Sequence, residues 1–145
     1  MLRAYICSPY RARTEAELDR NIDYAQEITR RALIAGVAPI TPHLYLTQCL
    51  DDKQRGERAV GMAAGMQLLK GCDFVIAGVR YGISEGMRRE IALADASGID
   101  VVNADKLAYY LRYRKRTYAI SWSAEERARE CIKELKHFFT EIQRE

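Results

Sequence analysis

Short apolar runs alternate with longer amphipathic segments over the first two thirds of the chain. The runs that are short and apolar enough to be strands are Arg3–Cys7, Val37–Thr41, Asp73–Val79 and Asp100–Asn103. The segments between them that place apolar residues at helical spacing are Thr14–Ala35, Gln54–Leu69 and Gly86–Ser97. This β-α-β-α-β-α-β order predicts an α/β fold with a doubly wound, flavodoxin-like parallel sheet of about four to five strands and flanking helices.

The ends of these segments carry residues that are typical of helix starts and stops. Thr14 and Glu17 form a capping box before the first helix, and Gly36 follows its end. The expected buried stripe of this helix comprises Leu18, Ile22, Ala25, Ile28, Ala32 and Leu33. Pro39 predicts an edge position for the second strand, because proline cannot donate to a strand ladder. An irregular segment that reaches Asp52 is expected to follow.

The last third of the chain has a different pattern. Tyr109–Tyr118 interleaves basic and aromatic side chains, which favours a solvated basic surface or an oligomer contact, with single-stranded nucleic acid as the alternative partner. We expect a short strand at Tyr118–Ile120 and an amphipathic C-terminal helix at Ser123–Gln143. Residues 1–145 are expected to form a single domain, with 104–145 as a C-terminal extension that could serve oligomerisation.

Composition narrows the class of protein. The chain has 145 residues, a net charge of +3 and a pI of about 8.7, which suits an anionic small ligand and makes nucleic acid an unlikely partner. Four scattered cysteines without a CxxC pair, and only two histidines, argue against a disulfide framework or a metal site. The longest mostly apolar stretch, Ala59–Leu69, is too short to cross a bilayer. We therefore expect a cytoplasmic protein with no membrane partner.

Two loops follow strands at the edge where doubly wound sheets bind ligands, Ser8–Arg13 and Arg80–Met87. In the second loop, Gly82 and Gly86 allow close backbone approach, and Ser84 precedes a helix whose first amides would attract a phosphate. The alternative is an ordinary βα turn in which Ser84 only caps the helix.

The segment Gly82–Glu90 resembles the active-site turn of the nucleoside 2-deoxyribosyltransferase superfamily, and within it the 2′-deoxynucleoside 5′-phosphate N-hydrolases. The residues that carry the resemblance are Ser84, Gly86 and Glu90 at the family's spacing, followed by Ala92 and Ala94. The wider pattern is similar to a group of small bacterial and phage proteins that share Tyr5–Pro9, Pro42–Leu44, Cys72–Asp73 and Ser84–Met87. The resemblance covers Arg3–Asn103.

This resemblance implies that Glu90 is the catalytic nucleophile, which attacks the anomeric carbon of a nucleoside or nucleotide and releases the base. It implies a transferase or N-hydrolase that needs no cofactor or metal and assembles as a homo-oligomer. The ligand-binding residues that it implies, together with the flanking positions, are Ser8, Pro9, Tyr10, Arg11, His43, Ser84, Glu85, Gly86 and Met87. We expect Arg88 and Arg89 to keep Glu90 ionised; the alternative is an exposed glutamate paired with an arginine.

One position departs from the family pattern. Gly65 stands where the family usually has an aspartate that contacts the sugar or assists the leaving base, so that role would fall to Asp51, to Asp52 or to no residue. The alternative function is therefore a non-catalytic protein that senses or sequesters a nucleotide signal, such as a cyclic ADP-ribose-type messenger. The GxxxG pair of Gly61 and Gly65 indicates close helix packing, with packing between subunits as one form of it.

Overall fold

The computed structural model describes residues 1–119, and the side chains of residues 1–114. Its four strands form one parallel sheet in the order β2-β1-β3-β4. The strands are β1 (Leu2–Cys7), β2 (Val37–Ile40), β3 (Phe74–Ala77) and β4 (Asp100–Asn103). The predicted doubly wound α/β fold is confirmed, and β2 lies at an edge of the sheet as Pro39 indicates.

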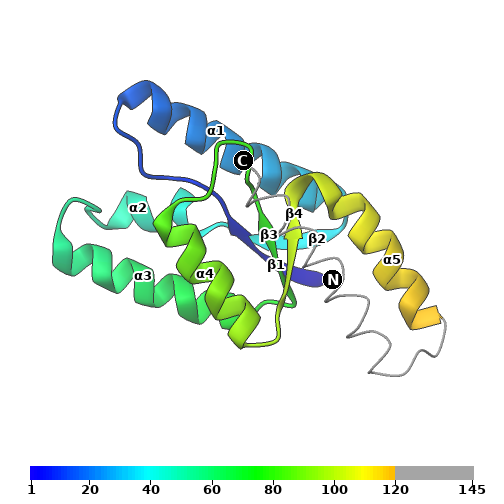
Figure 1. Cartoon of the computed structure of the whole chain (residues 1–145). Coiled ribbons are helices and arrows are strands. Elements are labelled where there is room, and N and C mark those ends of the chain that lie inside the picture. The colour runs from blue at the N-terminus through cyan, green and yellow to red at the C-terminus, as the bar shows by residue number, and fades with distance from the viewer. Residues whose placement is uncertain (120–145) are drawn as a thin grey trace. The chain divides into compact units, whose positions relative to one another are not determined.

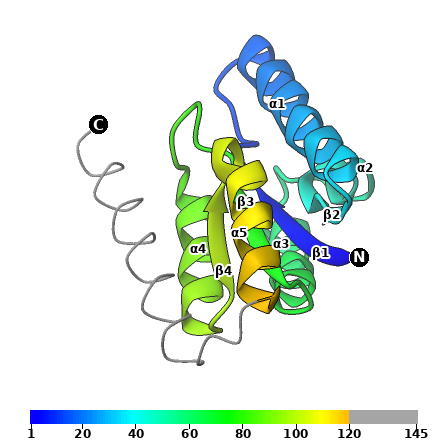
Figure 2. The same ribbon diagram turned by 90° about the vertical axis from the view of Figure 1, so that its right-hand side faces the viewer.

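The described part of the chain also contains five helices. They are α1 (Glu15–Ile34), the short α2 (Leu46–Cys49), α3 (Arg55–Lys70), α4 (Glu85–Ala96) and α5 (Leu107–Ala119), with 3-10 turns at Pro42–Leu44 and Ala104–Lys106. Helix α1 covers one face, while α3 and α4 lie side by side on the other (Figures 1 and 2). The chain divides into two compact units; the first, Met1–Ala104, holds the whole sheet, and α5 belongs to the second. Among the described helices, none is long and apolar enough to cross a membrane.

The core is built on β1 and β3, which lie at the centre of the sheet. Tyr5 pairs in register with Ile40 on one side and with Val75 on the other. Every residue of β3 is buried, as expected for a parallel strand that is covered on both faces. Immediately after β3, Gly78 packs so closely on α1 that an added Cβ would lie 2.4 Å from Cδ1 of Ile28. This contact sets the course of the chain where it leaves the sheet.

Three local predictions need correction. Leu33, expected on the buried stripe of α1, is 57% exposed, because Ala32 takes the core position and the next residue turns away by about 100°. Tyr118 lies in α5 and not in a strand, since the arginine, lysine and leucine residues before it favour continued helix. The segment before Asp52 is also not wholly irregular, because it contains a 3-10 turn and α2. The predicted helix Ser123–Gln143 lies outside the described residues.

Candidate functional site

A cavity of about 380 Å³ opens at the carboxyl ends of β1 and β3, where the fold predicts a ligand site. Its volume lies within the range of about 300–1,000 Å³ that is typical of small-molecule pockets. Residues of β1, the β1–α1 loop, α2, α3 and α4 line it. All of the site residues expected from the sequence line this cavity except Pro9, which is buried beside it.

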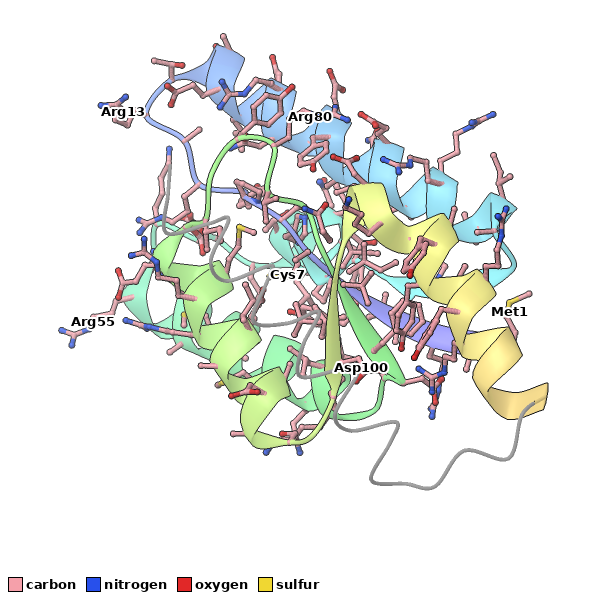
Figure 3. All side chains as sticks on the ribbon, turned by 45° about the vertical axis from the view of Figure 1, so that its right-hand side comes forward. Met1, Cys7, Arg13, Arg55, Arg80 and Asp100 are labelled. Carbon is pink, nitrogen blue, oxygen red and sulfur yellow. The ribbon has the colours of Figure 1, made fainter. Side chains whose placement is uncertain are left out.

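Glu90 projects from α4 and contacts β1. The Tyr5 hydroxyl donates a hydrogen bond of 2.6 Å to Oε1 of Glu90. Cys7 follows on the same face of the strand, and its thiol donates to the carbonyl oxygen of Met87, with Sγ at 3.9 Å. Figure 3 shows Cys7 in the interior, where it is fully buried. One strand residue, Tyr5, therefore holds the helix carboxylate in position.

The electrostatics of this group follow from its burial. Burial raises the pKa of the Glu90 carboxyl, and the hydrogen bond from Tyr5 and, to a smaller extent, the Cys7 thiol oppose that rise. Burial and the nearby carboxylate also raise the pKa of the Tyr5 phenol. The phenol therefore keeps its proton and donates a hydrogen bond to Glu90. The expectation that Arg88 and Arg89 hold Glu90 ionised is wrong. Adjacent helix residues point in different directions, and Arg89 pairs with Glu85 instead.

Two of the three glycines of α3 make room for this arrangement. A Cβ built on Gly65 would lie 3.2 Å from the Tyr5 hydroxyl oxygen, closer than almost all real Cβ contacts. A Cβ on Gly61 would lie 3.3 Å from Cδ1 of Leu50, which also lines the cavity. The close approach that the GxxxG pair indicates is therefore made inside the chain, to a strand and to a loop residue.

The start of α4 forms another wall of the cavity. Ser84 is the N-cap residue of the helix, and its hydroxyl oxygen accepts a hydrogen bond of 3.3 Å from the Met87 amide. The helix therefore begins at Glu85, one residue before the predicted start. Gly82 turns the chain with a φ of +86°, a conformation that favours glycine. Ser84 thus caps the helix, and the same residue lines the cavity.

A serine of the β1–α1 loop and a histidine of the 3-10 turn Pro42–Leu44 also line the cavity. The Ser8 Oγ lies 3.0 Å from Nε2 of His43, and the Tyr10 ring is centred 6.1 Å from the imidazole ring. Burial lowers the pKa of His43 to about 4, so the imidazole is neutral at neutral pH.

The rim of the cavity carries charged side chains that contact one another. Oδ2 of Asp52 lies 3.5 Å from Nε of Arg11 and 4.0 Å from Nη1 of Arg58. Glu57 accepts the backbone amide of Asp51 at 2.6 Å. Arg55, considered with these arginines as an anion contact, does not line the cavity and extends outward from the start of α3 (Figure 3).

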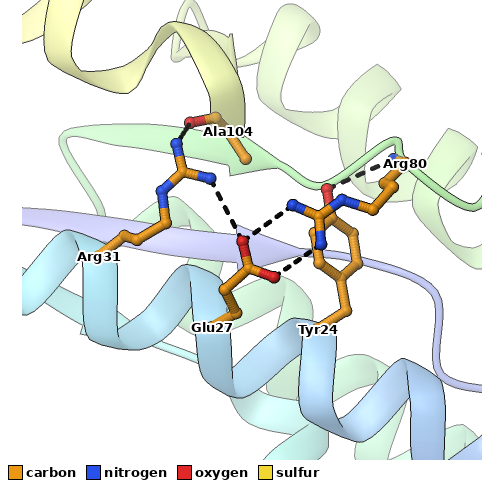
Figure 4. A network of polar contacts seen from close by, with 5 residues as sticks. All are labelled: Tyr24, Glu27, Arg31, Arg80 and Ala104. Carbon is orange, nitrogen blue, oxygen red and sulfur yellow. Dashed lines mark hydrogen bonds and ion pairs between the residues drawn. The ribbon is translucent and has the colours of Figure 1, made fainter.

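Helix α1 holds both loops that border the cavity. Asn21 is buried, and its Nδ2 donates to the carbonyl oxygens of Tyr10 and Arg11 at 3.2 and 3.5 Å. Nearly two turns further along α1, the Glu27 carboxylate accepts hydrogen bonds from both terminal nitrogens of Arg80, at 2.7 and 2.9 Å (Figure 4). The Tyr24 hydroxyl accepts the Arg80 amide at 3.4 Å.

One further side chain, that of Arg31, contacts Glu27. Arg31 lies 3.7 Å from Glu27 and donates to the carbonyl oxygen of Ala104 at 2.9 Å (Figure 4). The hydrogen bond from Arg80 lowers the pKa of the Glu27 carboxyl. Sequence reasoning missed this role of α1, because partners 53 residues apart leave no local pattern.

The described residues contain no cluster of three or more histidine, cysteine, aspartate or glutamate side chains that could hold a metal ion. Sequence reasoning also missed Tyr5 as a site residue. The available signal was the alternation of Tyr5 and Cys7 on one face of a strand that ends at a binding loop.

Fold and site together define a doubly wound α/β protein with a buried carboxylate in a small-molecule cavity. The family model described as "Domain of unknown function (DUF7768)" matches residues 3–104, and the chain belongs to this family. The comparison with curated proteins gives no match. Among solved structures, the chain is similar to a 2-deoxyribosyltransferase from the psychrotolerant bacterium Bacillus psychrosaccharolyticus, with a TM-score of 0.52, 16% identity and 70% of each chain covered. The expected superfamily resemblance is therefore confirmed at the level of the fold.

Proposed function

We propose that this protein acts on the N-glycosidic bond of a nucleoside or nucleotide, with Glu90 as the nucleophile. The observation that carries this proposal is the Glu90 carboxylate, which lines a nucleoside-sized cavity and accepts a hydrogen bond from Tyr5. The fold shared with a 2-deoxyribosyltransferase supports the same class of reaction.

In the proposed reaction, a carboxylate oxygen of Glu90 attacks C1′ of the sugar while the bond from C1′ to the base nitrogen breaks. The transition state has oxocarbenium character, and the nearby negative charge of the carboxylate stabilises it. A glycosyl ester of Glu90 results, and water or a second base then takes the sugar. Tyr5 keeps one carboxylate oxygen in place while the other attacks.

The cavity walls suggest how a substrate would lie. We place the sugar next to Glu90 and the flat base against apolar side chains of α2, of the loop that follows it and of α3. The residues of that apolar wall are Leu46, Leu50, Met62 and Met66. Hydroxyl or phosphate groups of the substrate would meet the start of α4 at Ser84 and Gly86, where amide groups favour anions.

The proposal is tested by incubating the full chain with mixed nucleosides, deoxynucleosides and their monophosphates, and by following free base by chromatography. We expect base release by the wild type and a loss of roughly a thousandfold or more in Glu90→Gln. Asp95→Asn is the matched control, because Asp95 is an exposed carboxylate of the same helix outside the cavity. Thermal stabilisation by a substrate without base release would instead support the non-catalytic alternative, which the absent side chain at Gly65 favours.

A further inference from the structure

The leaving base of an N-glycoside sets a chemical requirement that the cavity must meet. A neutral nucleobase leaves as an anion unless an acid protonates it, and a positioned general acid contributes about 10²–10⁴-fold to such steps. A base that is already positively charged, such as a pyridinium ring, leaves as a neutral molecule and needs no proton. The acids that line the cavity therefore indicate which kind of base the protein can release.

The carboxylates of the rim are engaged with other groups. Asp52 lies between Arg11 and Arg58. Glu57 accepts a backbone amide, and Glu85 pairs with Arg89 one turn further along α4. Each carboxylate therefore faces a guanidinium group or accepts a hydrogen bond from an amide, and none is placed to donate to a ligand.

Three further positions of the cavity do not supply the proton either. The Tyr5 hydroxyl already donates to Glu90. His43 is neutral and hydrogen-bonded to Ser8, and burial holds its pKa at about 4. Gly65 contributes no side chain, and the Tyr5 hydroxyl fills the space beside it. Within the described part of the chain, the lining of the cavity thus presents no carboxyl or imidazole group that is placed to protonate a leaving base.

The charge of the cavity favours a cation instead. Among the described lining residues there are four carboxylates, of Asp52, Glu57, Glu85 and Glu90, and three guanidinium groups, of Arg11, Arg58 and Arg89. The excess of negative charge and the half-buried Glu90 attract a positive ring. The thioethers of Met62 and Met66 line the wall against which such a ring would pack.

We propose that the substrate of this site is an N-glycoside whose base carries a positive charge, of the pyridinium nucleoside class, and this inference rests on the proposed function of Glu90. In the first step a Glu90 oxygen bonds to C1′, and the electron pair of the C1′–N bond passes to the ring nitrogen and cancels its charge. The neutral pyridine leaves without a proton. Water then attacks C1′ of the ester, which frees the sugar, restores the Glu90 carboxylate and releases one proton to solvent.

The test compares nicotinamide riboside, as a pyridinium nucleoside, with uridine and deoxyadenosine as neutral ones. Each is incubated with the full-length wild type at neutral pH, free base is measured, and the spontaneous release from that compound is subtracted. We expect kcat/KM to be at least about 100-fold higher for nicotinamide riboside, the lower end of what a general acid contributes. Equal values of kcat/KM, or a higher value for the neutral nucleosides, would overturn the proposed substrate class.

Two variants at one position add a matched comparison. Gly65→Asp places a carboxylic acid on the cavity wall, and Gly65→Ala places the same Cβ near Tyr5 without the acid. We expect Gly65→Asp to cleave deoxyadenosine at least tenfold faster than Gly65→Ala, while the two cleave nicotinamide riboside at similar rates. An equal effect of the aspartate on both substrates would refute the inference. Base release that Glu90→Gln leaves unchanged, or no release from any compound, would refute the proposed function as well.

Discussion

The hydroxyl oxygen of Tyr5 lies 3.2 Å from the position that a Cβ of residue 65 would take, so glycine at this point of α3 is what lets the phenol reach Glu90. A strand residue and a helix residue thus share one small space. In the sequence, Gly65 is only a departure from a family pattern. In the structure, the space that its missing side chain leaves lies next to the Tyr5 hydroxyl, which donates a hydrogen bond to Glu90. This relationship leads to the first prediction.

Gly65→Ala is expected to lower the rate of base release with little change in stability. The new methyl group displaces the Tyr5 hydroxyl from Glu90, while alanine favours the helix by up to about 1 kcal/mol and offsets the crowding. Gly56→Ala is the control, since it brings the same helix preference to α3 outside the cavity, with no atom within 4 Å of the new Cβ. Steady-state rates and thermal unfolding measure the two effects, and a Gly65→Ala rate equal to that of Gly56→Ala would contradict the prediction.

Tyr5→Phe keeps the buried ring and removes one hydrogen bond to a carboxylate. We expect kcat/KM to fall between about tenfold and a hundredfold, the range that corresponds to a hydrogen bond with a charged group. Tyr45→Phe removes a hydroxyl from an exposed ring outside the cavity and should leave the rate unchanged. A Tyr5→Phe enzyme as active as Tyr45→Phe would show that the phenol does not position Glu90.

The pH dependence of kcat/KM should reflect the buried carboxylate. Glu90 attacks only as the carboxylate, and burial raises its pKa, so activity is expected to fall with decreasing pH at values above the ordinary glutamate value of about 4.3. Tyr5→Phe should move this limb to still higher pH, because the Tyr5 hydrogen bond lowers the pKa of Glu90. Activity that stays constant down to about pH 4 would be inconsistent with this assignment.

The same burial predicts that Glu90 destabilises the folded protein at neutral pH. Since folding raises the pKa of this acid, the folded state binds its proton more tightly, and the contribution of Glu90 to stability decreases as pH rises from its unfolded pKa through its folded pKa. Glu90→Gln, whose amide oxygen still accepts from Tyr5, should raise the free energy of unfolding by about 0.5–2 kcal/mol at neutral pH. Denaturant unfolding should show this gain shrinking as the pH falls to about 4, and a pH-independent gain would contradict it.

Much of the fold could be predicted from the sequence because it depends on local patterns. The alternation of short apolar runs with amphipathic segments is enough for a doubly wound sheet, and Asp100–Asn103 is a strand with the predicted bounds. The capping of α1 by Thr14 and of α4 by Ser84 follows from residue type and position alone. The expected homo-oligomer and the compartment of the protein stay predictions.

The site was only partly predictable, because its contacts join distant parts of the chain. The neighbours of Glu90 in sequence are arginines, but its partner in space is Tyr5, 85 residues away. The support of the β3–α4 loop by Glu27 and Arg80 also depends on how α1 lies against the end of β3. Such pairings are fixed by packing of the whole sheet, and no spacing along the chain reveals them.

The most direct test of the role of Glu90 is mass spectrometry of the protein during turnover. The wild type and Glu90→Gln are mixed with a pool of nucleosides that includes nicotinamide riboside, quenched in acid, digested and compared. The account predicts a peptide of the wild type that carries one added sugar at Glu90, and no such adduct in Glu90→Gln. Base release by the wild type with the sugar on another residue, or undiminished base release by Glu90→Gln, would contradict it.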